Sequence, residues 1–444
     1  MYPPDEIRLC SSWPDNQRLP PRSGQRYARK AYTGWMTHSW QRLFWISWLS
    51  QILALAGFSF VYPFLPLYVQ HLGVHDKGQV LIWSGWLFAG TTIAMSICAP
   101  IWGAVSDRHG RKVMVVRSML SGAVLIFLMI FVQNPGELLV LRVLQGMLTG
   151  SVAASQALVS AAVPRERLGF CMGMMQTALF AGSSIGPLIG GQLDDHLGFG
   201  PTFLIASLML LLSGAMVSAL VHEDFIPEPR PAPGSGRGFW ADARAVFADR
   251  QIALLILVLG AVQFGGQIVG PILTVFVQDL GGSAHNAAAL AGNVFAAAGL
   301  GSAVTAVLVG RLTDRRGHFK LVLLLATIAT ALLYIPQHGV TSITQLYILR
   351  GLVGLTLGAM LATSSAMLSL GTPRERRGAV IGLSAGVNSA GQALGQLGGS
   401  AIASSFGVRS VFYLTAVVLG LVSVVVGLFL REPALPGTED PPAR

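Results

Sequence analysis

Long apolar segments alternate with short polar connections along nearly the whole chain. Twelve apolar segments reach about 20 residues, the length that a helix needs to cross the hydrocarbon core of a membrane. None shows the period-two alternation that is typical of a membrane β-barrel. The pattern predicts an all-α integral membrane protein with twelve transmembrane helices. The predicted spans are residues 43–70, 80–105, 113–132, 136–162, 168–192, 200–222, 251–279, 287–310, 319–337, 341–370, 377–402 and 408–431.

Composition supports a membrane location. The chain is 52% hydrophobic and 11% charged, whereas soluble proteins carry about 25% charged residues. A net charge of +10 alone would suit a nucleic-acid-binding protein, but the basic residues form short clusters between apolar segments, which argues against that class. The three cysteines are scattered without ligand spacing, so we expect no metal site, and nothing in the chain calls for a cofactor.

The distribution of Lys and Arg among the connections predicts the orientation. Of the 30 basic residues, Lys77 and Arg409 are the two in outer loops, and Arg142 and Arg350 lie inside spans. Nearly all the others fall on the opposite side, which the positive-inside rule assigns to the cytoplasm. We therefore expect a multi-pass protein of the cell inner membrane with both termini in the cytoplasm.

The longest connection divides the spans six and six. It contains "HEDFIPEPRPAPGSGRGFW", whose Pro, Gly and Ser predict a flexible linker over residues 223–250. The predicted organisation is a disordered tail over 1–42, a six-helix bundle over 43–222, the linker, a second bundle over 251–431 and a tail over 432–444.

The two halves repeat each other in sequence. "LYVQHLG" (67–73) matches "VFVQDLG" (275–281) at an offset of 208, and Arg142 matches Arg350 at the same offset. "VPRERLG" (163–169) matches "TPRERRG" (372–378) at 209, and the charged turn "GAVSDRHGRK" (103–112) recurs 207 residues later as "GRLTDRRGHFK". The sequence therefore predicts two pseudo-symmetric six-helix bundles.

These motifs together resemble those of the major facilitator superfamily, in particular its drug:proton antiporter group with twelve spans, of the bacterial multidrug-efflux type. "GAVSDRHGRK" resembles the loop 2–3 signature, "LRVLQGMLTG" (141–150) the fourth-helix motif, "GSSIGPLIGG" (182–191) the antiporter motif, and "YPFLP" (62–66) the first-helix prolines of drug exporters. The resemblance implies a secondary transporter that exports amphiphilic drugs by alternating access, driven by protons and monomeric in the lipid bilayer. The alternative is a carrier for a small anionic metabolite on the same fold. An enzyme is not expected, since the chain has no sizeable soluble segment and no P-loop.

The charged turn is the candidate gate. Asp107 lies one helical turn after Gly103, so both share a helix face, and its carboxylate could accept hydrogen bonds at the start of another helix. The resemblance implies that this partner is span 11 near Arg377 in the outward-facing state, with Arg111 orienting the carboxylate. The alternative is a solvated basic loop, and in the second copy His318 stands where Arg111 would be. The candidate gate residues are Gly103, Asp107, Arg108, Gly110, Arg111, Gly310, Asp314 and Gly317.

Span 5 carries glycines at positions i, i+4 and i+8. This stripe (Gly182, Gly186 and Gly190) allows close backbone contact, and Pro187 is expected to bend the helix. The resemblance implies that the motif, including Gly191, forms an occluding seam against span 8. Ordinary membrane packing is the alternative.

Two arginines lie inside spans, whereas no acidic residue lies in the middle of one. An arginine at membrane depth should face protein or water. The resemblance links Arg142 to proton transfer; a structural role is the alternative, and is favoured for Arg350. With no carboxylate to attract cations, we expect a preference for anionic, zwitterionic or neutral substrates. Further cavity candidates, each of which could instead be a packing contact, are Trp83, Gln176, Phe180, Gln263, Gln267, Asn293, Asn388 and Gln392.

Overall fold

The computed structural model describes residues 22–164, 167–223, 244, 246–282, 286–372 and 377–432. Side chains are described at these positions except at 22–39, 107, 310, 311, 314–316 and 377–379. The linker prediction, apart from its two ends, and the predicted C-terminal tail beyond Glu432 therefore lie outside the described residues.

Long helices occupy every predicted span. The first half contains α1 (Arg22–Ser59), α2 (Leu65–His71), α3 (Lys77–His109), α4 (Arg111–Leu128), η2 (Met129–Phe131), α5 (Pro135–Leu148), α6 (Ser151–Ala162), α7 (Leu168–Leu197) and α8 (Phe199–Leu220). The second contains α10 (Arg250–Gln267), η3 (Gly270–Ile272), α11 (Leu273–Asp279), α12 (Ala287–Arg316), α13 (Phe319–Tyr334), η4 (Pro336–Gly339), α14 (Ile343–Leu370), α15 (Arg377–Phe406) and α16 (Ser410–Phe429). Within the described chain, ten helical segments are long and apolar enough to cross a membrane. The two outside this group are α1 and α15, and α15 is rich in Gly, Ser and Gln.

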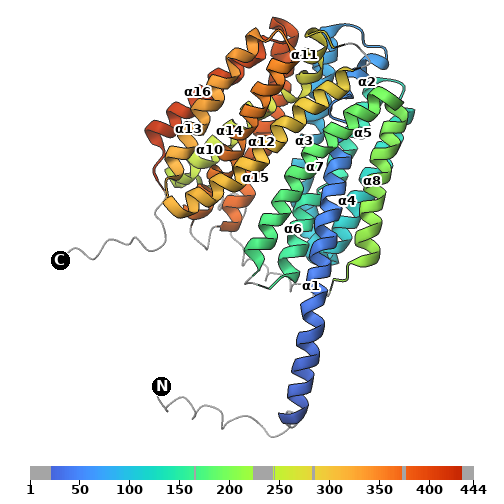
Figure 1. Ribbon diagram of the computed structural model, residues 1–444, viewed down its shortest axis with the longest axis vertical. Helices are drawn as coiled ribbons and strands as arrows, with labels where there is room; N and C mark the ends of the chain where they lie inside the picture. The colour runs from blue at the N-terminus through green and yellow to red at the C-terminus, as the bar shows by residue number, and fades with distance from the viewer. Residues whose placement is uncertain are drawn as a thin grey trace, which may run out of the picture.

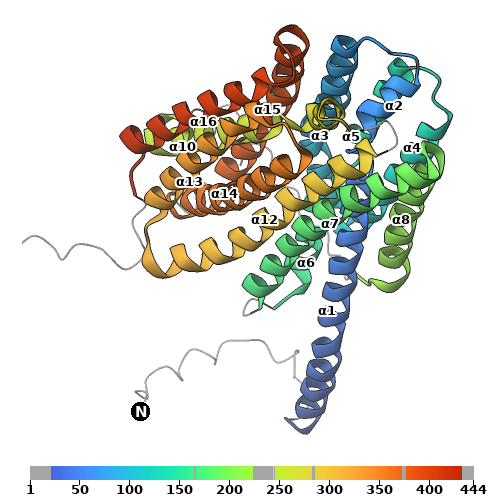
Figure 2. The same cartoon turned by 45° about the horizontal axis from the view of Figure 1, so that its top comes forward.

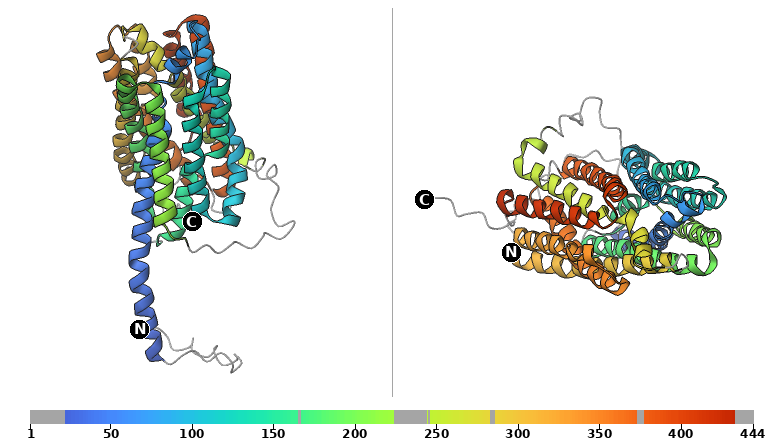
Figure 3. Two further views of the ribbon diagram at one scale, coloured as in Figure 1. Left: turned by 90° about the vertical axis from the view of Figure 1, so that its right-hand side faces the viewer. Right: turned by 90° about the horizontal axis from the view of Figure 1, so that it is seen from above.

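The helices form two bundles that lie side by side. Seen from above, the helices of the first half occupy one side and those of the second half the other (Figure 3). The second bundle is inclined against the first, and the two meet along α3, α7, α12 and α15 (Figure 2). This arrangement confirms the predicted all-α fold with two six-helix halves.

Large apolar side chains are found both inside and outside the bundles. Phe60, Phe203, Phe276 and Phe412 are fully buried, while large apolar residues such as Leu428 (72% exposed) cover the outer surface. Such a surface is stable only where hydrocarbon replaces water around the protein.

The first span of each half is broken at the same place. α1 ends at Ser59 and α2 begins at Leu65, after Pro63; α10 ends at Gln267 and α11 begins at Leu273, after Pro271. The two prolines are 208 residues apart, and each removes a backbone donor from its helix. The break is therefore part of the repeat.

The fourth span breaks the symmetry. α5 ends at Leu148 and α6 begins at Ser151, with Gly150 between them at φ +137°. The equivalent Gly358 lies inside the uninterrupted α14. The single helix predicted over 136–162 is therefore two helices.

The first helix begins earlier than predicted. α1 starts at Arg22, within the segment predicted as a tail, and extends beyond the end of the bundle (Figure 1). Extending an existing helix avoids the cost of nucleation, and no proline interrupts the chain after Pro21 until Pro63.

Candidate functional site: the seam between the two halves

The glycine stripes hold helices together within each half. A Cβ atom on Gly186 would lie 2.5 Å from the carbonyl oxygen of Ala56, and one on Gly190 would lie 2.2 Å from that of Phe60. α7 therefore touches α1 backbone to backbone. The prediction that this stripe faces span 8 is wrong, because positions four apart share one helix face and that face is occupied by α1.

The second half repeats this contact. Cβ atoms on Gly391, Gly395 and Gly399 of α15 would lie 2.2–2.4 Å from carbonyl oxygens of α10 and of Ile268 directly after it. These glycines follow Gly182, Gly186 and Gly190 at an offset of 209. Their partners Gly260, Phe264 and Ile268 follow Ile52, Ala56 and Phe60, which lie in α1 and directly after it, at 208. In each half, the fifth helix is thus fixed to the first.

A different face of α7 meets the other half. A Cβ atom on Gly191 would lie 2.2 Å from the carbonyl oxygen of Ala288, and one on Gly292 would lie 2.2 Å from that of Pro187. Farther along, Gly299 packs against Ser184. The predicted contact of the motif with span 8 therefore exists, but through Pro187 and Gly191 rather than through the stripe.

The α3–α15 contact completes the seam. Gly85 packs against Ser400 and the carbonyl of Gln396, and the Thr92 hydroxyl donates to Gln396 Oε1 at 3.2 Å. Gln396 occupies the position that Pro187 holds in the first half. We call these α3–α15 and α7–α12 contacts the seam.

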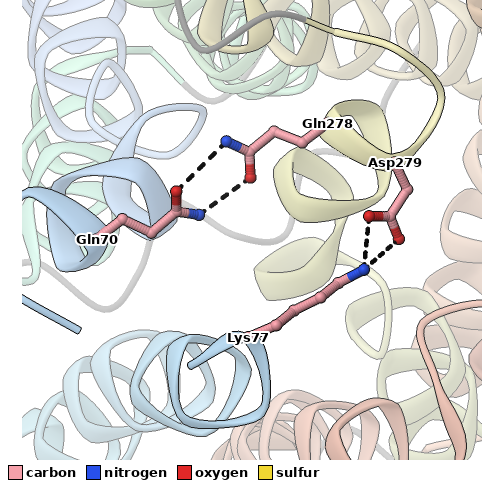
Figure 4. A network of polar contacts seen from close by, with 4 residues as sticks. All are labelled: Gln70, Lys77, Gln278 and Asp279. Carbon is pink, nitrogen blue, oxygen red and sulfur yellow. Dashed lines mark hydrogen bonds and ion pairs between the residues drawn. The ribbon is translucent and has the colours of Figure 1, made fainter. Parts of the chain in front are cut away.

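All the described seam contacts lie toward one end of the molecule, which we call the closed end. There Gln70 and Gln278, equivalent residues of the two halves, exchange hydrogen bonds of 3.0 and 3.4 Å between their amide groups (Figure 4). Beside them Lys77 Nζ contacts both carboxylate oxygens of Asp279 at 2.5 and 2.6 Å. The Thr274 hydroxyl also donates to the Pro63 carbonyl at 2.6 Å.

The halves separate toward the opposite end, which carries the charged turns and which we call the turn end. Cβ atoms on Gly103 of α3, Gly173 of α7 or Gly382 and Gly386 of α15 would have no neighbour within 4 Å. These positions lack the close helix contacts found at the closed end, and the two bundles diverge toward the turn end (Figure 2).

The charged turns are held by carboxylates that sequence reasoning missed. Glu223 accepts hydrogen bonds from the backbone N–H groups of Arg111 and Lys112 at 3.0 and 2.7 Å, at the start of α4. Glu432, 209 residues later, accepts from Phe319 and Lys320 at the start of α13. The sequence signal was a Glu placed just after the sixth span of each half.

The gate candidates are only partly described. Gly110 and Gly317 end α3 and α12 at φ values of +94° and +69°, a region that favours glycine. The side chains of Asp107 and Asp314 and the environment of Gly310 lie outside the described residues. Arg108 and Arg111 are placed on either side of Gly110, and the contact with span 11 stays a prediction.

Arg142 is 2% exposed and lies in α5. Its Nη1 donates to Gln145 Oε1 at 3.1 Å, while Nε and Nη2 are buried without a hydrogen-bond partner. Because a buried unsatisfied donor is costly, these two N–H groups are available to donate hydrogen bonds to a further acceptor.

Arg350 has a different environment. Its guanidinium carbon lies 5.6 Å from the ring of Tyr334 and 5.9 Å from that of Phe412, and Nη1 is 3.5 Å from the Tyr334 hydroxyl. Its Nε and Nη2 are buried without a hydrogen-bond partner, as are those of Arg142. The two equivalent arginines therefore share two unpartnered nitrogens and differ in their neighbours, which for Arg350 are an aromatic pair within its own half.

The cavity candidates have different partners in the structure. Asn293 accepts a hydrogen bond from Gln192 across the seam at 3.3 Å, and Gln176 accepts one from Gln156 at 3.1 Å. Asn388 keeps a buried oxygen without a partner. The others, Trp83, Phe180, Gln263, Gln267 and Gln392, are half-buried on their helices.

Two pseudo-symmetric bundles that meet along a seam closed at one end define a membrane transporter of the alternating-access class. The family model described as Major Facilitator Superfamily matches residues 47–287 and 255–444. The chain belongs to this superfamily.

Relatives and solved structures agree with this assignment. The chain is 34% identical over 400 residues to "Multidrug resistance protein MdtG" of Klebsiella pneumoniae, covering 89% of this chain and 95% of that protein. It is also 34% identical over 381 residues to the protein of the same name from Yersinia enterocolitica, covering 86% and 91%. A bacterial homologue of the human lysosomal transporter Spinster, solved inward-facing and unoccupied, has a similar fold: TM-score 0.69, 16% identity, covering 90% of this chain and 99% of that one. The human organic anion transporter MFSD10 gives a TM-score of 0.64 at 18% identity, covering 87% and 99%.

We expect Gly191→Ala to open the closed end. The new methyl group would meet the Ala288 carbonyl at 2.2 Å, and such overpacking costs about 1–3 kcal/mol. A cysteine placed at Asn293, beside this contact, should then react with a membrane-impermeant maleimide roughly tenfold faster. Gly173→Ala in the same helix meets nothing within 4 Å and is the matched control. Equal labelling rates in the two variants would contradict the seam's role.

Proposed function

We propose that this protein is a secondary transporter that exports amphiphilic drugs or toxic small molecules across the inner membrane in exchange for protons. The observation that carries the proposal is the seam, which is closed at one end and open at the other. Extensive identity with the MdtG proteins, whose names describe multidrug resistance, supports efflux of drugs rather than uptake of a nutrient.

The charge distribution supports an orientation for this conformation. The turn end carries the clusters of Lys and Arg that the positive-inside rule assigns to the cytoplasm. The conformation described here is then open to the cytoplasm, with both termini on that side. Substrate would enter from the turn end and leave after the closed end opens.

Asp107 would act in the other conformation, in which the turn end is closed. When the halves close at the turn end, α3 approaches the start of α15, and a carboxylate at that point would interact favourably with the free N–H groups of the helix. Glu223 supports this role, because its hydrogen bonds tie the first residues of α4, shortly after Asp107, to the segment that follows α8.

Arg142 supports a preference among substrates. A buried guanidinium with two unpartnered nitrogen atoms suits a carboxylate or phosphonate, which a planar fork binds through two parallel hydrogen bonds. Permanently charged cations would be repelled. We therefore propose that anionic, zwitterionic and neutral amphiphiles are favoured over cations.

Uptake into inverted membrane vesicles tests the function. Vesicles that contain the protein should accumulate a labelled bile acid or alkylphosphonate when their interior is acidified, and a protonophore should abolish this accumulation. Ethidium should accumulate less. Absence of gradient-driven uptake across such a panel would contradict the proposed export, whereas uptake of ethidium alone would contradict only the charge preference.

Arg142→Lys should reduce transport of the anionic probe at least tenfold, because a lysine cannot form two parallel hydrogen bonds with one anionic group. Arg350→Lys is the matched control: it can keep its cation–π contact with Tyr334, so we expect transport to fall less than threefold. The measurement is the initial uptake rate at equal amounts of folded protein in the membrane. An equal loss in both variants would mean that the two arginines share a structural role.

A further inference from the structure

Amide side chains form two rows in the second half of the chain. α15 carries Asn388, Gln392 and Gln396 at positions i, i+4 and i+8, and α10 carries Gln263 and Gln267 at i and i+4. Positions four apart share one helix face, so each helix presents its amides along one side. We call these five side chains the amide face.

The contact between α10 and α15 brings the two rows to the same side. The glycine stripe of α15 meets positions of α10 that advance in the same direction along the chain, so the two helices run parallel. Gln396 follows the contact residue Gly395 by one position, whereas Gln263 precedes the contact residue Phe264 by one. Each residue turns a helix by about 100°, and in parallel helices these opposite steps lead to the same side of the pair.

This side is directed at the first half. Gln396 accepts a hydrogen bond from the Thr92 hydroxyl of α3 at 3.2 Å, across the seam. Gln392 and Asn388 lie one and two turns farther along α15 in the direction of the turn end, where the two bundles diverge (Figure 2). The amide face therefore continues from the seam into the space between the halves.

Most of these amides are free to bind another group. Gln263, Gln267, Asn388 and Gln392 are half-buried. Within the described part of the chain, Gln396 is the one member of the amide face whose side chain has a hydrogen-bond partner, and the Asn388 Oδ1 atom is buried without one. A buried amide without a partner is costly, and a ligand that supplies hydrogen bonds would remove this cost.

The first half has no counterpart of the amide face. At the equivalent positions, 208 or 209 residues earlier, the sequence has Leu55, Ser59, Leu179, Ser183 and Pro187. The repeat preserves the glycine stripes that hold these helices together, but not the amides beside them. The amides are therefore a feature of the second half and are not required by the helix packing that both halves share.

The chemistry of an amide suits uncharged polar groups. Each amide offers two N–H donors and a carbonyl acceptor, so it can bind a hydroxyl group or another amide in either direction. A hydroxyl group that leaves water without a new partner loses free energy, and the amide face supplies such partners at membrane depth without the cost of a buried charge.

The amide face lies at the level of Arg142 in the membrane. The Thr91 hydroxyl of α3 donates to the Arg142 carbonyl at 3.1 Å, and the next residue, Thr92, donates to Gln396. α3 thus contacts the helix of the buried guanidinium and the amide face within one turn. Acidic and neutral polar groups of one molecule would meet different halves of the protein at this level.

We propose that the amide face binds the hydroxyl and amide groups of the substrate, so that the favoured substrates are amphiphilic acids that also carry such groups. The acidic group is bound by Arg142 and the neutral polar groups by Gln392, Asn388 and their neighbours. This inference rests on the proposed function, because it divides recognition of the exported molecule between the two halves. The rival role is structural: α3 would cover the amide face and bond to it when the turn end closes.

Equilibrium binding tests this assignment without a gradient or transport. The full chain is placed in lipid nanodiscs, and the dissociation constants of two labelled acids are measured. One is cholate, a bile acid with hydroxyl groups, and the other is cholanate, the same steroid acid without them. Empty nanodiscs correct for partition into lipid. The decisive quantity is the change in each dissociation constant when one amide is replaced.

Gln392→Leu should weaken cholate binding about tenfold, because a substrate hydroxyl group loses its partner, and should change cholanate binding less than threefold. Cholanate binding also shows that the variant is folded. Gln345→Leu is the matched control, since it makes the same substitution at an exposed position at the start of α14, and it should change neither constant.

Equal weakening of both acids in Gln392→Leu would establish the structural role and overturn the proposal, and so would unchanged binding of cholate. Failure of the export proposal gives a different result. In that case acidified vesicles would not accumulate cholate, while Gln392→Leu would still weaken its binding selectively.

Discussion

The structure depends on helices that touch through their backbones. Within a membrane, association gains little from the hydrophobic effect, so close van der Waals contact between small residues must hold helices together. The stripes on α7 and α15 supply this contact at three successive turns in each half. They fix the fifth helix of each half to the first, so that each bundle can move as one body. The seam between the bundles also uses glycines, among them Gly85, Gly191 and Gly292, together with hydrogen bonds such as that between Thr92 and Gln396.

Much of the fold could be predicted from the sequence because membrane insertion imposes length and hydropathy directly. The spans, their division into six and six and the repeat all follow from such patterns. Hydropathy does not reveal which neighbour a helix face meets, and the face of Gly182, Gly186 and Gly190 was therefore assigned to the wrong helix. The hydrogen bonds of Glu223 and Glu432 were missed for a related reason: both residues lie just outside a span, where polarity alone suggests a loop.

The halves share a framework but differ where substrate and protons are expected to act. Arg142 and Arg350 both keep Nε and Nη2 buried without partners, but Nη1 of Arg142 bonds Gln145 whereas Arg350 packs against Tyr334 and Phe412. The chain breaks at Gly150 but continues as helix through Gly358, and Pro187 is replaced by Gln396, which bonds Thr92. The common features are backbone contacts, which any transporter with rigid halves requires. The differences lie in the break at Gly150 and in the side chains that surround the two arginines and replace Pro187.

The central claim is that the two halves pivot as rigid bodies about the seam, so that one end closes as the other opens. Distances between spin labels at both ends of the wild-type framework test this most directly. One pair lies at Gln133 and Thr341 at the closed end, and the other at His109 and His318 at the turn end, each measured in nanodiscs under conditions that vary the populations. The account predicts that every gain in the long distance at one end is matched by an equal gain in the short distance at the other. Ends that open or close independently would contradict it.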